Sequence, residues 1–226
     1  ADEFLPPYQT ENRFDFEHQV NMGYSAGPEY NRYFKYWAHR DMCNAVPVID
    51  EVEARFARVF GRAYPGVIES YRTDDADIVM VTLGSIAGLV REVVDGLRSI
   101  GVAAGVIRIR YMRPFPAAPL AAALGSARAV GVLEKDVSFG AEGTVFTNVN
   151  SALMQHGGRR ALPTTMNFIG GLGGDDISAE QIERAFEKLS QAARADAAPS
   201  DRVLFLGIDD VDGGSGCGGS VEEVAR

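Results

Sequence analysis

The sequence is poor in the residues that usually bind metals. Its 226 residues include two cysteines, Cys43 and Cys217, and three histidines. Two thiolates are fewer than the four that an iron–sulfur cluster normally needs, and the histidines lack metal-ligand spacing. The cysteines lie far apart in unlike surroundings, so we expect a reducing, cytoplasmic location and no disulfide framework. We therefore expect no metal site on this chain.

The sequence also lacks long apolar runs and an excess of positive charge. No apolar stretch approaches the roughly 20 residues of a membrane-spanning helix. The net charge is −9, which would repel nucleic acids and anionic membranes. We expect neither as a partner. The hydrophobic content of 46% instead fits a globular protein, with one domain and an appendage.

Residues 1–60 are set apart by their aromatic content, and we predict an N-terminal arm followed by linker helices. No period organises the arm before Glu29, so its rings cannot pack on one another. The arm therefore either wraps a neighbouring domain or subunit or packs on its own domain. From Glu29 to Phe60 apolar residues recur at helical spacing, and Pro47 predicts a break into two helices. Ten aromatic residues lie in the first 40: Phe4, Tyr8, Phe14, Phe16, Tyr24, Tyr30, Tyr33, Phe34, Tyr36 and Trp37.

Residues 61–208 alternate between strand-like and helix-like patterns. This alternation predicts an α/β domain with a five-stranded, mostly parallel wound sheet. Ser178 and Gln181 predict a capping box at the last helix. The tail, residues 209–226, is Gly-rich and acidic and is expected to be disordered or loosely held. The expected strands are 77–83, 105–111, 129–134, 164–169 and 203–207, and the expected helices are 86–100, 117–125, 143–156 and 178–194.

Several short loops follow the predicted strands. If the strands are parallel, these loops converge on the carboxyl edge of the sheet, where open α/β sheets bind ligands and partners. The question is whether this edge performs chemistry or docks a partner. The loops are Gly84-Ser85, Arg113-Pro114-Phe115-Pro116, Lys135–Gly143 and Gly170–Gly174.

Two of these loops lie where phosphates are often bound, before a helix. In the loop Gly170–Gly174 a glycine fingerprint fails, because Asp176 takes the place of the last glycine. Asp175 and Asp176 would also repel a phosphate. We favour a tight structural turn there over a phosphate site. Ser85 is expected to cap its helix, with an anion site as the alternative.

Charged residues near the same edge allow two interpretations. Arg108 and Arg110 share one strand face and Arg113 follows, so they either clamp an anion or pair with local acids, which we favour. Glu134, Lys135, Asp136 and Glu142 bracket Ser138. Such carboxylates can act as general acid and base, but interlocking surface charge is favoured. A hydrolytic triad is not expected, because no histidine lies nearby in sequence.

Taken together, residues 61–189 resemble the transketolase C-terminal-like domain of the alpha subunit of pyruvate:ferredoxin (flavodoxin) oxidoreductases, members of the 2-oxoacid:ferredoxin oxidoreductase family. The sequence departs from that family's pattern at Lys135 and Asp175, where the family tends to have arginine. The stretches that carry the resemblance are Gly61-Arg62-Ala63-Tyr64, Glu69–Ala76, Val81–Ser85, Ile107–Arg110, Arg113–Pro116, Asp136, Ser138–Gly140, Glu142-Gly143, Asn167–Ile169, Gly171–Gly174 and Asp176-Ile177.

The resemblance implies an oxidoreductase complex that converts pyruvate and coenzyme A to acetyl-coenzyme A and CO2 and passes electrons to ferredoxin. In such complexes thiamine diphosphate acts as the electron sink. The thiamine diphosphate, Mg and iron–sulfur clusters are expected on other domains or subunits, because the diphosphate-binding Gly-Asp-Gly signature is absent here. The expected partners are thiamine-binding and ferredoxin-like subunits, with ferredoxin and coenzyme A as partners of the complex.

The leading hypothesis is therefore a docking domain, with no catalytic, cofactor-binding or metal residue of its own and no activity in isolation. One alternative is the C-terminal domain of the beta subunit of a 2-oxoacid dehydrogenase, or of a transketolase relative. Two others are an autonomous anion- or nucleotide-binding module and an interaction domain without a ligand. The candidate docking edge consists of Gly84, Ser85, Arg113, Phe115, Lys135, Asp136, Ser138, Phe139, Glu142, Gly171, Gly173 and Gly174.

Overall fold

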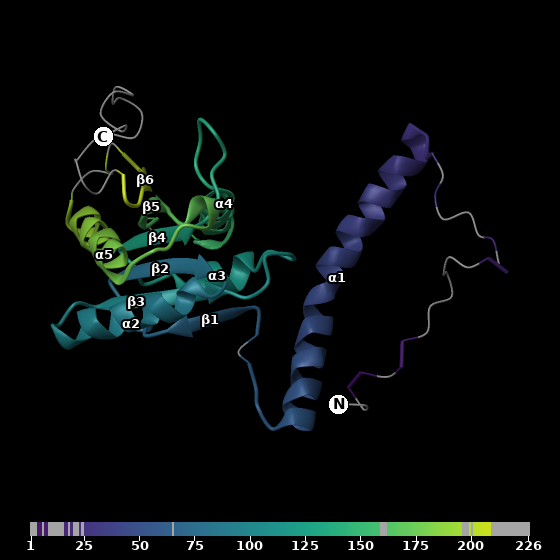
Figure 1. Cartoon of the computed structure of the whole chain (residues 1–226), viewed down its shortest axis with the longest axis horizontal. Helices are drawn as coiled ribbons and strands as arrows, with labels where there is room; N and C mark the ends of the chain where they lie inside the picture. Colours follow the sequence, from purple (N-terminus) through teal and green to yellow (C-terminus); the bar gives the residue numbers. More distant parts are fainter. Residues whose placement is uncertain are drawn as a thin grey trace. The chain divides into compact units, whose positions relative to one another are not determined.

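The computed structural model describes residues 25–64, 66–158, 162–195, 199 and 201–208, and also positions 4, 5, 7, 8, 16, 17, 19 and 23. The chain divides into two compact units, Ala1–Gly66 and Val67–Arg226 (Figure 1). Most of the predicted aromatic arm and the whole predicted tail, 209–226, lie outside the described residues. Each unit is described by itself.

The first unit is built on one long helix. The helix α1 runs without interruption from Pro28 to Phe60, with Pro47 inside it, so the prediction of two linker helices was wrong. Proline's fixed φ is itself helical, and only one backbone hydrogen bond is lost at Pro47, so the neighbouring turns continue the helix. Gly61, with a φ of 67°, ends it by donating its N–H to Ala57. The Phe4 ring packs edge-on against Phe56, with ring centroids 5.6 Å apart.

The second unit contains a six-stranded sheet in the order β1-β3-β2-β4-β5-β6. Five strands are parallel, and β1 pairs with β3 in the antiparallel direction. The prediction of five strands missed β1, because a four-residue strand in which only Ser70 is fully exposed gives little periodic signal. The strands are β1 (Ile68–Tyr71), β2 (Ile78–Leu83), β3 (Ala104–Ile109), β4 (Ala129–Glu134), β5 (Thr164–Ile169) and β6 (Val203–Phe205).

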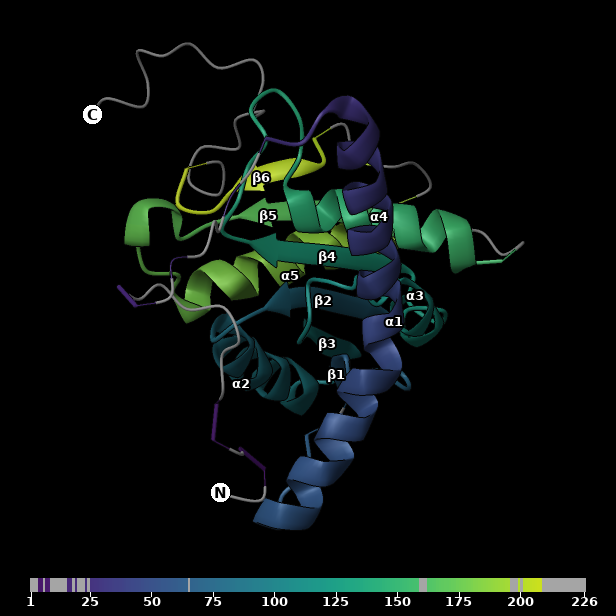
Figure 2. The same cartoon turned by 90° about the vertical axis from the view of Figure 1, so that its right-hand side faces the viewer.

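Helices cover both faces of this sheet, as Figure 2 shows. The helices α2 and α5 pack on one face, and α3 and α4 pack on the other. The capping box at Ser178 and Gln181 is present, as the sequence predicted. In the described part of the chain, no helix is both long and apolar enough to cross a membrane. The helices are α2 (Ile86–Ser99), α3 (Ala117–Ala123), α4 (Thr144–His156) and α5 (Ala179–Arg194), with a short 3-10 turn, η1, at Leu172–Gly174.

Alternation along the central strands creates two apolar cores. Met80 and Val106 face the layer of α2 and α5, where Phe168 and Phe186 are also buried. Val81 lies among the residues packed under α3 and α4. A strand buried on both faces reads as a continuous apolar run, which is why β2 and β4 were located from sequence almost to the residue.

A close backbone contact favours glycine at one position in the sheet. A Cβ atom added to Gly105 in β3 would lie 2.6 Å from the carbonyl oxygen of Arg72. We expect Gly105→Ala to lower the free energy of unfolding by about 1–3 kcal/mol, because backbone must move to admit the methyl group. Gly96→Ala in α2 is the matched control. Its Cβ would meet nothing within 4 Å, and we expect a gain of about 0.5–1 kcal/mol. Urea unfolding of both variants measures the contrast, and equal effects would contradict it.

Candidate functional site

The loops after β2, β4 and β5 come together at the carboxyl edge of the sheet. Between the ends of β2 and β4 lies a cavity of about 240 Å³. The strand order turns back at this point, because β3 lies on one side of β2 while β4 and β5 lie on the other. Such a switch point opens a crevice in wound sheets. The lining includes Gly84, Ser85 and Lys135 of the predicted docking edge.

Lys135 links two of the loops. A Cβ atom added to Gly171 would lie 2.7 Å from the Cε and 2.8 Å from the Nζ of Lys135. The lysine side chain therefore lies directly on the backbone of the loop after β5. Gly171 has a φ of 69°, so both the conformation and the close approach favour glycine there. The structure thus brings together two loops that are 36 residues apart at these positions (171 − 135).

The loop Gly170–Gly174 forms a tight turn. Gly171, Gly173 and Gly174 all have positive φ angles, and Leu172–Gly174 forms the turn η1. The Asp175 carboxylate accepts a hydrogen bond from the N–H of Asp176 at 3.0 Å, which places one negative charge directly after the turn. This geometry agrees with the structural turn that the sequence favoured.

Ser85 does not cap α2 as predicted. Its backbone is already helical, with φ −73° and ψ −26°, and its side chain makes no capping hydrogen bond. A capping side chain normally needs an extended backbone at this position. Gly84, with a φ of 74°, instead turns the chain from β2 into α2, and the Ser85 side chain borders the crevice.

The three arginines near this edge have separate surroundings. Arg108 lies 3.7 Å from Glu69, whose other carboxylate oxygen is 2.7 Å from Arg91. This pairing agrees with the local-acid interpretation for Arg108. The Arg110 guanidinium lies over the Tyr111 ring, 5.5 Å from its centroid. Arg113 is exposed and donates to the carbonyl of Met112 at 2.7 Å.

Glu134 is a buried anchor and not part of an exposed charge cluster. Its residue is 4% exposed, which corrects the expectation of surface charge at this position. The carboxylate accepts hydrogen bonds from the N–H groups of Val145 at 2.7 Å and Phe146 at 3.1 Å. These are among the first residues of α4, so the carboxylate satisfies N–H groups that the helix leaves unpaired and balances its dipole.

Asn167 completes this network. Its Nδ2 donates to Glu134 at 2.9 Å and to the carbonyl of Val132 at 3.2 Å, and its Oδ1 accepts from the N–H of Gly143 at 2.8 Å. A Cβ atom on Gly143 would lie 2.2 Å from the Glu134 carboxyl group, so only glycine fits. The sequence analysis gave Asn167 no role. The available signal was one amide within the apolar run of β5, because such a buried group requires partners.

The remainder of the β4–α4 loop projects outward. Asp136 accepts a hydrogen bond from the N–H of Thr144 at 3.2 Å, and contacts with Thr144 hold the pKa of this carboxyl below its usual range. A backbone hydrogen bond joins Ser138 to Glu142 at 3.2 Å and closes the loop. Phe139 stands at its tip and is 95% exposed. The loop is therefore fixed at both ends and presents a bare aromatic ring.

Exposed apolar side chains recur across this edge. Phe139 follows β4, Leu172 follows β5 and Ile208 follows β6, and these strands are neighbours in the sheet. Phe115, another predicted docking residue, packs partly against the core under α3 and α4. Exposed apolar side chains thus stand on the loops that follow three neighbouring strands.

Several polar groups of the same edge have structural partners. Within the described residues, no three His, Cys, Asp or Glu side chains form a group that could hold a metal ion. Ser138 is exposed, and its backbone closes the loop. The Glu134 carboxylate is occupied by three N–H donors. The polar groups of Glu134 and Ser138 thus have structural partners in the β4–α4 region.

Removal of the Glu134 carboxylate is expected to destabilise the domain. Glu134→Ala leaves the N–H groups of Val145 and Phe146 and the Asn167 amide without their acceptor. We expect a loss of about 2–4 kcal/mol in the free energy of unfolding, measured by urea denaturation. The matched control is Glu187→Ala on the exposed face of α5, which should change it by less than about 0.5 kcal/mol. Similar losses in both variants would show that Glu134 is no anchor.

The same group predicts a pH dependence. Burial raises the pKa of Glu134 above its ordinary 4.5, and the N–H donors of Val145 and Phe146 oppose the rise. The folded chain therefore binds this proton more readily than the unfolded chain. Ionisation of Glu134 therefore lowers the free energy of unfolding. The loss begins near pH 4.5 and is complete once the pH exceeds the folded-state pKa. Glu134→Gln cannot ionise, so the stability advantage of the parent chain over this variant should shrink as pH rises. Urea midpoints at several pH values would refute this if the difference stayed constant or grew.

Comparison with known proteins adds to this geometry. Residues 76–182 match the family described as pyruvate:ferredoxin oxidoreductase core domain II. Among solved structures, a split-gene transketolase aligns with 59% of this chain and 45% of its own, at 19% identity and a TM-score of 0.45.

Two relatives illustrate the sequence similarity. The pyruvate synthase subunit PorA of Methanosarcina barkeri is 37% identical over 207 residues, which is 91% of this chain and 51% of the relative. The ketoisovalerate oxidoreductase subunit VorA of Pyrococcus abyssi is 37% identical over 84% of this chain and 48% of its own length. The chain thus spans about half the length of the curated relatives it matches. On this similarity, its α/β unit belongs to the pyruvate:ferredoxin oxidoreductase family as a core domain II.

Proposed function

We propose that this chain serves as a docking part of the alpha subunit of a 2-oxoacid:ferredoxin oxidoreductase, with pyruvate as the favoured substrate. In the proposed reaction, pyruvate and coenzyme A give acetyl-coenzyme A and CO2, and two electrons pass to ferredoxin. The observation that carries the proposal is the similarity to pyruvate synthase subunits along 91% of the chain. Ketoisovalerate is the second candidate substrate, because a relative that acts on it is equally identical.

The described residues do not favour a thiamine diphosphate site at the carboxyl edge. The carboxyl-edge cavity of about 240 Å³ is smaller than the roughly 300 Å³ at which pockets for organic ligands begin. The nearby turn also carries the carboxylates of Asp175 and Asp176, which would oppose a diphosphate. We therefore place the thiamine diphosphate, its metal and the iron–sulfur clusters on other domains or subunits. In this proposal the chain contributes no reacting group.

The proposed docking surface is the carboxyl edge of the sheet. Its support is the set of exposed apolar side chains at Phe139, Leu172 and Ile208. Glu134 and Lys135 hold the loops of Phe139 and Leu172 in place. The partner would be a thiamine-binding or ferredoxin-like subunit of the complex. The exposed aromatic side chains of α1, among them Tyr30 and Trp37, are proposed to pack on another part of the same assembly.

The alternative of a 2-oxoacid dehydrogenase or transketolase domain is less well supported. Residues 76–182 match the ferredoxin-dependent family. The relatives described above are also named for that family's chemistry. A reducing, cytoplasmic setting belongs to the proposal, because two cysteines in 226 residues do not form a disulfide framework.

A binding experiment tests the docking surface. The chain is co-expressed with candidate thiamine-binding and ferredoxin-like subunits, and the complex is measured by size exclusion and calorimetry. Phe139→Asp combined with Leu172→Asp should weaken assembly at least about tenfold, because each places a charge in a desolvated contact. Met154→Asp is the control, since Met154 is also exposed (76%) but lies near the carboxyl end of α4. Assembly unaffected by the double variant would reject the proposed surface.

A turnover assay tests the absence of a reacting group. The chain alone, supplied with pyruvate, thiamine diphosphate, Mg, coenzyme A and an electron acceptor, should give no acetyl-coenzyme A. The assembled complex should give it. Turnover by the chain alone would overturn the non-catalytic role while leaving the family assignment intact.

A further inference from the structure

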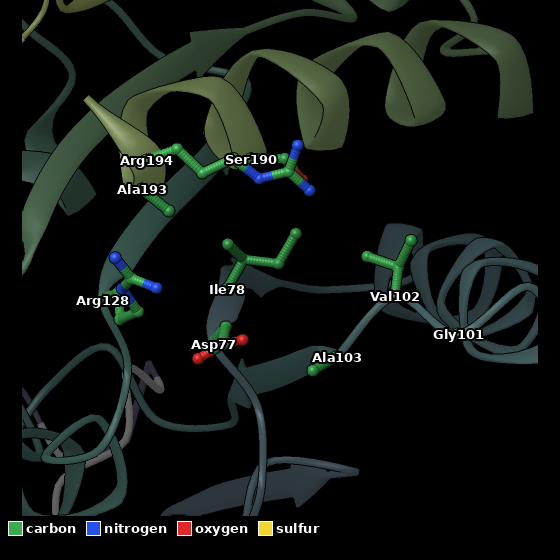
Figure 3. Close-up of a pocket in the computed structure, with 9 residues that line it drawn as sticks. All are labelled: Asp77, Ile78, Gly101, Val102, Ala103, Arg128, Ser190, Ala193 and Arg194. Atoms are coloured by element: carbon green, nitrogen blue, oxygen red, sulfur yellow. The ribbon is translucent and has the colours of Figure 1, made fainter.

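The amino edge of the sheet carries a second cavity, at the ends of β2 and β4 opposite to the docking surface. It has a volume of about 170 Å³. Figure 3 shows its lining, which comes from the starts of these strands, the turn after α2 and the last turns of α5. Neither the sequence motifs nor the proposed function uses it. The polar lining residues are Asp77, Arg128, Ser190 and Arg194.

Two guanidinium groups border this cavity, together with the carboxylate of Asp77. Arg128 immediately precedes β4, and Arg194 is the last residue of α5. Among the described residues, neither side chain has an ion pair or a hydrogen bond. The contrast with Arg98 is clear, because that side chain contacts Asp75 at 2.8 Å through two nitrogens. In Figure 3 both free guanidinium groups border the open space over Ile78.

The backbone beneath these groups is already fixed. The carbonyl of Asp77 accepts hydrogen bonds from the N–H groups of Arg128 at 2.8 Å and Ala129 at 3.2 Å. The N–H of Asp77 donates to Ala103 at 2.9 Å. Three strand beginnings are thereby tied together, and the cavity exists without any rearrangement. A preformed site binds with a smaller loss of conformational entropy.

The chemistry of the lining selects the ligand. Guanidinium forks match the planar oxygens of carboxylates and the oxygens of phosphates, and Ser190 adds a hydroxyl donor. The lining residues Ile78, Val102 and Ala193 are apolar, whereas Arg128 and Arg194 are exposed, so a bound anion would remain in contact with solvent. With two arginines and one aspartate the local charge is +1, in a chain whose net charge is −9. The cavity volume is several times the roughly 30 Å³ that one water occupies, so a small oxyanion fits.

We propose that this cavity binds a small oxyanion, a carboxylate or a phosphate, between Arg128 and Arg194. The Ser190 hydroxyl donates to the same anion. Asp77 opposes binding and keeps the affinity modest. Because the cavity lies at the amino ends of the strands, the anion binds without competing for the docking surface at their carboxyl ends.

The test is a titration of the full chain with inorganic phosphate at constant ionic strength, followed by nuclear magnetic resonance. Constant ionic strength separates binding from general screening. We expect saturable shifts at residues that line the cavity. Arg128→Gln and Arg194→Gln should each weaken phosphate binding about tenfold or more, the effect of losing a charge-assisted hydrogen bond. Asp77→Asn should strengthen it, which impaired folding cannot imitate.

The control is Arg58→Gln on α1, which removes the same charge outside the cavity and should leave binding unchanged. A parallel titration with succinate distinguishes the two sources of oxyanion, and the tighter ligand identifies the class. If neither phosphate nor succinate gives saturable shifts at the cavity, the proposal is overturned. Equal weakening by Arg58→Gln, or no strengthening by Asp77→Asn, overturns it as well. Thermal melting of each variant confirms that the chain is folded during the titration.

Discussion

The arrangement of the carboxyl edge depends on one buried carboxylate. Glu134 ends the central strand β4, and its oxygens accept hydrogen bonds from the first turn of α4 and from Asn167 on β5. Strand, helix and neighbouring strand are therefore joined at one point. The nine-residue loop between Glu134 and Thr144 is fixed at its two ends, and its tip extends from the domain. Such a fixed base would suit the proposed docking surface, because a preformed surface loses less conformational entropy on binding.

Much of the fold follows from periodicity, and the exceptions have physical causes. The strands β4 and β5 have the predicted bounds, because strands buried on both faces are uninterrupted apolar runs. The antiparallel β1 was missed because four residues carry too little pattern. The prediction of a helix break at Pro47 was wrong, because the hydrogen bond lost at proline costs less free energy than ending a helix of 33 residues there. Local rules thus describe the regular core better than its periphery.

The candidate site was harder to foresee, because sequence gives the residue types but not which of them are buried. Glu134 and Asp136 stand two positions apart, yet burial raises the pKa of one and contacts with Thr144 lower that of the other. Lys135 was expected at the edge, but its contact with Gly171 depends on two loops meeting across neighbouring strands. The amino-edge cavity has no motif at all, since its arginines come from segments 66 residues apart (194 − 128).

The two outer strands of the sheet are short, with four residues in β1 and three in β6. Each leaves only a few backbone N–H and C=O groups facing outward, and β1 runs against the direction of its neighbour. A long parallel edge would invite a second sheet to add on by strand pairing. These termini of the sheet discourage such lateral growth. The proposed association through side chains on loops would therefore not compete with edge-to-edge strand pairing between copies of the sheet.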